Sequence, residues 1–255
     1  MPAHRRILRP FLLGVAGLAG LAVPGARLVA APPRPNDFRF IDNGRIRLGI
    51  NTHWEAGIAC VSPSGSRQSR VNPFDHGRLI QQSYYGAEDG SFWDKQPWSG
   101  NPVPGGDWSE DTAHVLEIES GRDWIHARSR AKHRASDADL QEVTLEEDIP
   151  LTNRLVEVRF SFHYTGLKRH PEHRHENPAV FLESELATLA LYEGPKPWTV
   201  HVGTNDRELG AYVPLARELT PSRFGDGRAD YGACSYFTPL TKIPIEQGTK
   251  FTCDL

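Results

Sequence analysis

The sequence predicts an all-β fold, a large antiparallel β-sandwich built from a single domain. Short runs that alternate apolar and polar residues recur along the chain, and clusters of Gly, Pro, Asn and Asp separate them. Strand-like and helix-like segments do not alternate, which argues against a parallel sheet. No internal repeat is visible. About 225 residues follow the N-terminal segment, enough for one well-buried domain.

The N-terminal segment predicts export. Three arginines within the first nine residues precede an uncharged run, 11–23, rich in Leu, Ala and Gly, and small residues follow it. This is the layout of a secretory signal peptide, and the apolar run is too short to span a bilayer comfortably. We therefore expect a signal peptide at 1–30, one domain at 31–255 and a periplasmic or secreted location. An uncleaved N-terminal anchor is the alternative.

Charge and cysteine content narrow the class of partner. Cleavage near residue 30 would remove four arginines and no acid, leaving 25 basic and 32 acidic residues, a formal charge of −7. Such a surface argues against nucleic acid or an anionic membrane as the main partner. Cys60, Cys234 and Cys253 are an odd count without metal-type spacing. They allow one disulfide with one thiol left over, and they do not predict a disulfide framework.

The first third of the domain begins with a predicted hairpin. Two alternating runs, 38–41 and 45–50, flank Asp42-Asn43-Gly44, and an Asn-Gly turn between such runs is a strong hairpin signal. A further β-prone run, 57–61, ends at the turn residues 62–65.

Plainly β-like patterns continue from residue 113. Runs at 115–119, 124–128 and 140–145 precede the clearest strand, 155–164. There the even-numbered residues from Val156 to Tyr164 are apolar, whereas the odd-numbered ones from Glu157 to His163 are polar, so one face is expected to be core.

Two details complete the expected outline of the chain. Only 183–191 competes as a helix, because leucines recur there at helical spacing. The sequence stops within an alternating run at 251–255, and strands normally end in turn residues. We therefore expect a sandwich truncated at its C-terminus.

The stretch from Asn72 to Gly86 is unusually rich in polar recognition groups. Asp75 and His76 precede Gly77, and a short β-prone segment begins at Arg78. In a strand, Arg78, Gln82 and Tyr84 would share one face, and burying such groups is unfavourable unless each finds a partner. We predict that these three residues project together to bind a polar, hydroxyl-rich ligand. An edge strand with a solvated face is the alternative.

A long connection, 87–111, carries three tryptophans among several Gly and Pro residues. Connections of this length are usually functional or disordered, and the aromatic content argues against disorder. We expect Trp98 and Trp198 to provide stacking walls for sugar rings, with Asn101 and Asp107 as polar anchors. In the alternative, the tryptophans only cover the core.

A basic, His-rich segment, 169–176, raises the question of a metal site. His173 and His175 would share one face of a strand, but Arg and Lys neighbours oppose a cation and no remote ligand set is visible. We interpret the segment as a solvated charged loop and expect neither a metal nor a cofactor. Nucleophilic catalysis is not indicated either, because no Gly-x-Ser-x-Gly elbow occurs.

Glu176 is the first-ranked proton carrier, followed by Asp75 and His76. It precedes Asn177-Pro178 and a β-prone run, a position expected at the mouth of a strand. Two carboxylates facing a sugar would suit acid/base hydrolysis. We therefore hypothesise an exported carbohydrate-active enzyme that hydrolyses or otherwise processes an extracellular or envelope glycan. A non-catalytic glycan-binding sandwich and, more weakly, an envelope structural protein are the alternatives. The oligomeric state stays open.

Five blocks together resemble a family of exported bacterial β-rich proteins without a settled activity. They are Asp75–Tyr85 (DHGRLIQQSYY), Asn101–Asp107 (NPVPGGD), Glu176–Phe181 (ENPAVF), Tyr192–Thr199 and Gly210–Pro214. In that family a Gln typically precedes the Glu of ENPAVF, whereas His175 stands here, and the last strand usually runs on past residue 255. The resemblance implies an architecture similar to the large sandwiches of the galactose-mutarotase type.

Overall fold

The computed structural model describes residues 5–7, 37–54, 56–74, 77–86, 92–93, 96–97, 100–103, 114–133, 138–153, 155–192, 198–202, 208–212, 218–224 and 232–255. Within these ranges the regular elements are β-strands, there is no α-helix, and each strand pairing is antiparallel. The predicted all-β class and antiparallel sandwich are therefore confirmed. The described residues include no helix long and apolar enough to cross a membrane.

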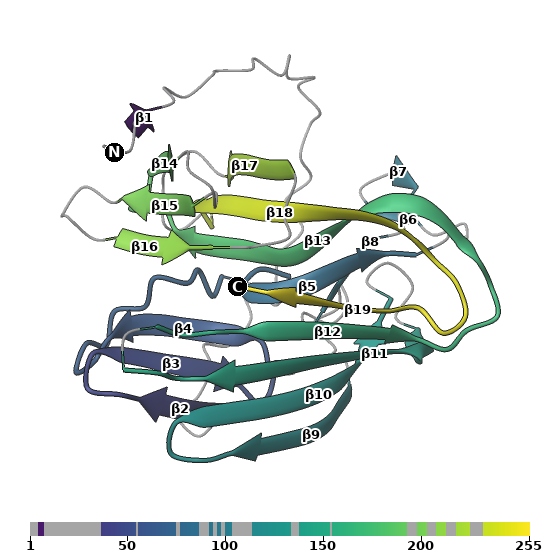
Figure 1. The fold of residues 1–255 in the computed structure, drawn as a ribbon, viewed down its shortest axis with the longest axis horizontal. Coiled ribbons are helices and arrows are strands. Elements are labelled where there is room, and N and C mark those ends of the chain that lie inside the picture. Colours follow the sequence, from purple (N-terminus) through teal and green to yellow (C-terminus); the bar gives the residue numbers. More distant parts are fainter. Residues whose placement is uncertain are drawn as a thin grey trace, which may run out of the picture.

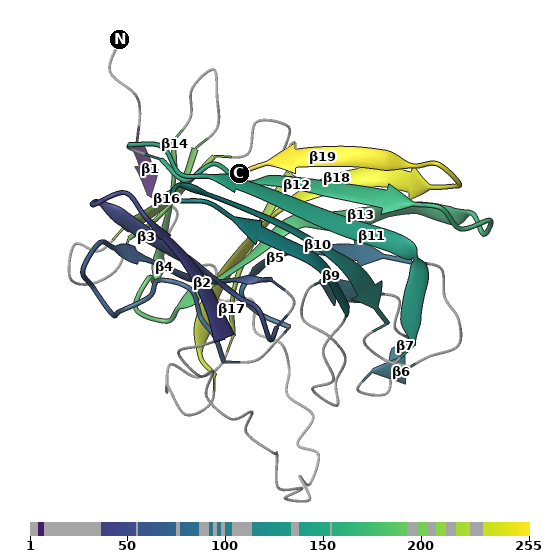
Figure 2. The ribbon, with the colours of Figure 1, turned by 90° about the horizontal axis from the view of Figure 1, so that it is seen from below.

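The larger sheet has eight strands and carries most of the residues discussed below. Its order is β17-β18-β13-β5-β4-β3-β2, with β8 also paired to β5. The bounds are β2 (Phe38–Asp42), β3 (Ile46–Asn51), β4 (Ile58–Pro63), β5 (Ile80–Tyr85), β8 (Gly100–Val103), β13 (His170–Glu183), β17 (Glu218–Phe224) and β18 (Cys234–Ile245). In Figure 2 the long strands β13 and β18 run in the same general direction as β11, β12 and β19.

The second sheet has five strands in the order β19-β12-β11-β10-β9. They are β9 (His114–Ser120), β10 (Trp124–Lys132), β11 (Asp139–Pro150), β12 (Arg159–Tyr164) and β19 (Lys250–Asp254). A smaller sheet holds β1 (Arg5–Ile7), β14 (Thr188–Tyr192), β15 (Trp198–Val202) and β16 (Glu208–Ala211), and a two-stranded ribbon holds β6 (Phe92–Trp93) and β7 (Gln96–Pro97). Figure 1 shows how these layers are arranged.

The core lies between the eight-stranded and the five-stranded sheets. Alternation in β12 buries Phe160, Phe162 and Tyr164 there, while its odd-numbered residues point away. From the other sheet, Ile58 and Val180 meet this layer. We call the core-facing side of the eight-stranded sheet its inner face and the opposite side its outer face. The two faces have different chemistry.

The predicted hairpin is confirmed, and the predicted strand at 155–164 is present over a shorter range. The hairpin at 38–50 is β2 and β3, and Gly44 has the positive φ of 83° that the turn requires. The segment 155–164 is shorter as a strand than predicted, because Val156 forms only an isolated bridge to Leu151 and β12 begins at Arg159.

Other expectations were wrong or stay open. The segment 183–191 is the end of β13, a turn and β14, so the helical alternative does not apply. The connection 87–111 contains β8, which pairs with β5, and is therefore not a structureless loop throughout. Residues 5–7 pair with β14, which the sequence did not predict; cleavage after residue 30 stays a prediction. No disulfide joins Cys60, Cys234 and Cys253 to one another.

Candidate functional site

Strand β5 divides its residues between the two faces of the larger sheet. Ile80 and Tyr84 belong to the inter-sheet core, and Gln82 points the same way. Ser83 and Tyr85 lie on the outer face, where they meet side chains of β13. The alternation expected from residue 80 onward is therefore present, and the hydroxyl groups of Ser83 and Tyr85 lie on the outer face.

Gln82 and Tyr84 are buried between the sheets. The Gln82 Nε2 donates to the carbonyl oxygens of Glu146 at 3.1 Å and Ser161 at 3.3 Å in the opposing sheet. The Tyr84 ring packs against Phe162 with ring centroids 5.2 Å apart. These contacts give the polar groups internal partners, which is how such a strand is accommodated in a core. A ligand-binding role for either residue stays a prediction.

Arg78 lies outside the strand alternation that was expected to group it with Gln82 and Tyr84. β5 begins two residues later, and Leu79 adopts a positive φ of 72°, which redirects the chain. Arg78 donates from Nη1 to the Gly232 carbonyl, and its guanidinium lies 4.8 Å from the centroid of the Phe74 ring. A Cβ on Gly232 would lie 2.7 Å from that ring, so this corner is closely packed.

Glu176 lies on the outer face, opposite Ser83 of β5 and Leu240 of β18. The Tyr236 hydroxyl donates to Glu176 Oε1 at 2.6 Å, and the Ser83 side chain also bonds to the carboxyl group. Burial raises the pKa of Glu176, while the bonds from Tyr236 and Ser83 act in the opposite direction. The carboxyl is thus half-buried and held by two hydroxyl groups.

An aromatic contact lies beside this arrangement. The rings of Tyr85 and His173 stack with centroids 4.6 Å apart and planes 19° apart. Burial raises the pKa of the Tyr85 hydroxyl, and the charge of Glu176 adds to that shift. We define the outer-face site as Ser83, Tyr85, Glu176 and Tyr236, and His173 contacts this site through the Tyr85 ring.

His175, one residue before Glu176, has a structural role. Its ring is fully buried, accepts at Nδ1 from the Tyr85 backbone N–H at 3.0 Å and donates from Nε2 to the Ile243 carbonyl at 3.1 Å. Burial lowers the pKa of His175 to about 4, so the imidazole is neutral at ordinary pH. His175 therefore ties β5, β13 and β18 together beneath the site.

The outer-face site has the groups for proton transfer and for binding hydroxyls. A carboxyl with a raised pKa can deliver a proton, and the hydroxyls that hold it can stabilise the carboxylate that remains. Stacked rings beside it offer a surface for the C–H face of a sugar. Within the described ranges no group of three or more metal-ligating side chains is positioned to hold a metal ion.

The remaining predicted residues are not placed together by the structure. Asp75, His76, Trp98 and Asp107 lie outside the described residues. Asn101 and Trp198 are described in their backbone only: Asn101 pairs with Tyr84, and Trp198 pairs with Tyr192. The roles predicted for these six residues stay predictions.

Sequence reasoning missed Ser83, Tyr85 and Tyr236 as members of the site. Ser83 and Tyr85 occupy the alternate face of the predicted strand, so the alternation itself contained the signal. Tyr236 is 60 residues from Glu176 along the chain. The register of β13 against β18 brings Glu176 and Tyr236 together, and no local sequence pattern predicts that register.

Comparisons with known proteins give remote structural likenesses alone. No family model and no curated protein matches the chain. Among solved structures, a putative aldose 1-epimerase from Escherichia coli K12 has 9% identity and a TM-score of 0.46, over 85% of this chain and 96% of that one. A galactose mutarotase-like protein from Lactobacillus casei has 12% identity and a TM-score of 0.42, over 85% and 98%. A galactose mutarotase related enzyme from Lactobacillus acidophilus has 10% and 0.44, over 85% and 95%. These neighbours are mutarotase-like sandwiches, the type named by analogy from the sequence, and likenesses this remote assign no activity to the chain.

Proposed function

We propose that this chain is an exported carbohydrate-processing enzyme in which Glu176 carries the proton. The observation that supports the proposal is the position of Glu176, half-buried on the outer face with a raised pKa and held by Tyr236 at 2.6 Å. A carboxyl kept protonated to higher pH than usual can act as a general acid near neutrality. The N-terminal layout supports export.

The chemistry follows from what surrounds the carboxyl. Protonated Glu176 would donate to an oxygen of the bound sugar, such as the oxygen of a glycosidic bond. The carboxylate left behind would then accept from Tyr236 and Ser83, which hold it in place for reprotonation. Tyr85, stacked on His173, would lie against the sugar.

Hydrolysis would require a second group to activate water or attack the sugar. Two carboxyl groups on opposite sides of the scissile bond supply this function in most glycoside hydrolases. None of the causes of the Glu176 pKa shift among the described residues is a neighbouring carboxylate. Asp75, in the polar stretch that leads into β5, is our proposed second carboxylate.

A screen of the secreted protein on bacterial and plant glycans tests the proposal. We expect product from at least one glycan, and we expect Glu176→Gln to abolish turnover while binding of the same glycan persists. Glu147→Gln, an equivalent change of a buried carboxyl between the sheets, is the matched control and should keep turnover. Saturable binding without product on any glycan would instead favour the non-catalytic glycan-binding sandwich.

Export has a separate and direct measurement. The protein expressed with its own N-terminus in a bacterial host should be recovered from the periplasm or medium. Its new N-terminus should lie near residue 30. An intact N-terminus in the membrane fraction would support the uncleaved anchor.

A further inference from the structure

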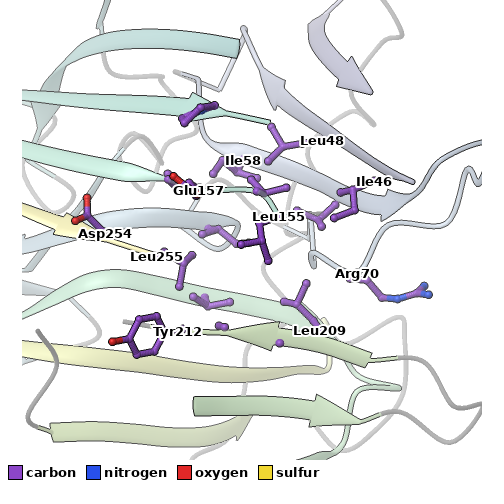
Figure 3. A pocket seen from close by; sticks show the side chains of 18 of the residues that line it. Ile46, Leu48, Ile58, Arg70, Leu155, Glu157, Leu209, Tyr212, Asp254 and Leu255 are labelled. Carbon is purple, nitrogen blue, oxygen red and sulfur yellow. The ribbon is translucent and has the colours of Figure 1, made fainter. Parts of the chain in front are cut away.

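A cavity lies between the sheets, away from the outer-face site. Here β4 and β5 are joined through one residue pair, Ile58 and Ile80, so the eight-stranded sheet opens on its inner side. A cavity of about 920 Å³ occupies the opening, within the size range of small-molecule sites. Its lining comes from β3, β4, β5, β13, β16, the residues around the start of β12 and the end of β19 (Figure 3).

The deep part of the cavity is aliphatic, whereas its remaining lining includes charged residues and Tyr212. Leu48, Ile58, Val158 and Val180 form its buried part, and each is at most 4% exposed. In Figure 3, Leu155 and Leu255 lie between the neighbouring strands β3 and β4, which carry Leu48 and Ile58, and strand β16, which carries Leu209. Branched aliphatic walls offer dispersion contacts and water exclusion, and Tyr212 contributes one aromatic ring to the lining. They suit a flexible hydrocarbon chain.

The interior offers little to a polar ligand. The Ser62 hydroxyl, which lines it, already donates to the Ser66 carbonyl at 3.4 Å. A sugar placed here would lose its water hydrogen bonds without replacement. The aliphatic interior therefore favours a hydrocarbon over a sugar.

The rim of the cavity has a cationic end. Arg45 and Arg70, on the β3–β4 side, both line it, and Figure 3 shows Arg70 at one edge of the aliphatic group. The acids Asp148 and Asp254, on the opposite rim, lie within 3.0 Å of His126 and Arg159 respectively. An anionic head group would be favoured near Arg70 and opposed near Glu157, which is exposed on that opposite rim.

The mouth is marked by an exposed aliphatic side chain. Leu155 lines the cavity and is 54% exposed, unusual for a leucine held in a defined turn. Its backbone N–H donates to Thr152 Oγ1 at 3.2 Å, and its carbonyl accepts from the Thr152 N–H at 3.1 Å. The turn thus holds an apolar side chain at the entrance, where a hydrocarbon chain would cover it.

We propose that this cavity binds the hydrocarbon chain of a monoanionic amphiphile, a fatty acid or a ligand of the same chemistry, with its carboxylate at the Arg70 end. The site is separate from the outer-face site, because Ile80 and Val180 face the cavity whereas Ser83 and Glu176 face outward. The proposal does not depend on carbohydrate processing.

The experiment compares three probes on the full chain below their critical micelle concentrations. The probes are dodecanoate, dodecyltrimethylammonium and benzoate, followed by titration calorimetry and by methyl NMR. We expect saturable one-site binding of dodecanoate with shifts confined to the methyl groups that line the cavity. Dodecyltrimethylammonium should bind at least tenfold more weakly, because the cationic head loses the charge-assisted contact. Benzoate, which lacks the chain, should not bind measurably.

Two matched pairs of variants locate the probe. Arg70→Gln should weaken dodecanoate binding about tenfold or more, whereas Arg67→Gln, an exposed arginine that does not line the cavity, should leave it unchanged. Leu155→Glu should abolish binding, whereas Leu167→Glu, at a leucine 85% exposed elsewhere, should not. Leu155 is itself exposed, so this pair decides the outcome if Arg70→Gln unfolds.

Three outcomes would overturn the proposal. They are the absence of saturable dodecanoate binding, equal affinity for the anionic and cationic probes, and equal loss of binding in Leu155→Glu and Leu167→Glu. Equal affinity would remove the role of Arg70, and the other two would remove the cavity as a site. The glycan screen is unaffected by each of them.

Discussion

Two glutamates, one between the sheets and one on the outer face of the eight-stranded sheet, have raised pKa values but different surroundings. Glu147, in β11 of the five-stranded sheet, is 7% exposed between the sheets, and its Oε1 has no hydrogen-bond partner within the described residues. Glu176, on the outer face, is held by Tyr236 and Ser83. Burial is the main cause of the pKa shift at both positions.

The different surroundings of Glu147 and Glu176 distinguish a carboxyl whose pKa is raised by structural burial from a carboxyl that is a candidate for function. A raised pKa alone marks a site only with low specificity, because structural burial produces the same shift. Glu147 faces side chains of the core, and its cross-strand neighbours are Ala127 and Phe160. Glu176 has hydroxyls that can stabilise it in both protonation states. Accessibility and partners, rather than the shift, make Glu176 the candidate.

The largest expected effect is on turnover. Glu176→Gln keeps the size and hydrogen bonding of the side chain but removes the transferable proton. We expect it to lower kcat/KM on any glycan that the protein turns over by about 10²–10⁴-fold. Glu147→Gln should change kcat/KM by less than about threefold, since the side chain lies between the sheets. Steady-state kinetics of the two variants is the measurement, and equal losses would show that folding, not chemistry, had been disturbed.

For the pH dependence of stability, we expect Glu147→Gln to have a larger effect than Glu176→Gln. In the unfolded chain Glu147 ionises above about pH 4.3, whereas in the folded chain its raised pKa keeps it protonated. Its contribution is therefore fully present below the unfolded pKa and is lost as pH rises toward the folded pKa.

We therefore expect Glu147→Gln to remove a loss of stability on the order of 1–3 kcal/mol between about pH 4.5 and 8, measured as the difference from the unmodified protein at each pH. Urea unfolding at the two pH values measures it. Glu176→Gln should remove less, because Tyr236 and Ser83 oppose the shift at Glu176. Parallel pH dependences for the unmodified protein and Glu147→Gln would contradict the burial of an ordinary carboxyl there.

Whether the sequence predicted a feature depends on how far apart along the chain its interacting residues lie. The β-hairpin at 38–50 and the two faces of 80–85 were predictable, because turn residues and alternation are local. The sequence did not show which face of β5 is the inner one, since both faces carry polar groups. That depends on Gln82 reaching Glu146 and Ser161 in the other sheet.

The same reasoning explains the mixed result for the candidate site. Glu176 was selected because it precedes Asn177-Pro178, a local feature. Its partner Tyr236 depends on the register of β13 and β18, which has irregular steps between Glu176 and Val180. Alternation could not place Arg78 either, because the positive φ of Leu79 interrupts it.

A smaller effect is expected from removing one hydroxyl. Tyr236→Phe deletes the donor to Glu176 Oε1, and this donor lowers the pKa of Glu176. The pKa of Glu176 should therefore rise further. Carboxyl ¹³C NMR titration measures it without knowledge of the substrate. Tyr164→Phe is the control, because that hydroxyl donates to the Lys168 carbonyl in another part of the molecule. An unchanged or lowered pKa in Tyr236→Phe would show that the bond does not stabilise the carboxylate.

The smallest expected effect concerns two consecutive tyrosines of β5. Tyr84 packs on Phe162 in the core, and Tyr85 stacks on the exposed ring of His173. Double-mutant cycles with leucine at each position isolate the two coupling energies. We expect about 1–1.5 kcal/mol for the buried pair and about 0.5 kcal/mol for the exposed pair, because solvent competes for the outer rings. A weak outer coupling would let a sugar displace His173 from Tyr85 at little cost. An outer coupling as large as the inner one would mean that the Tyr85–His173 stack is structural, and a ligand would then have to bind beside it.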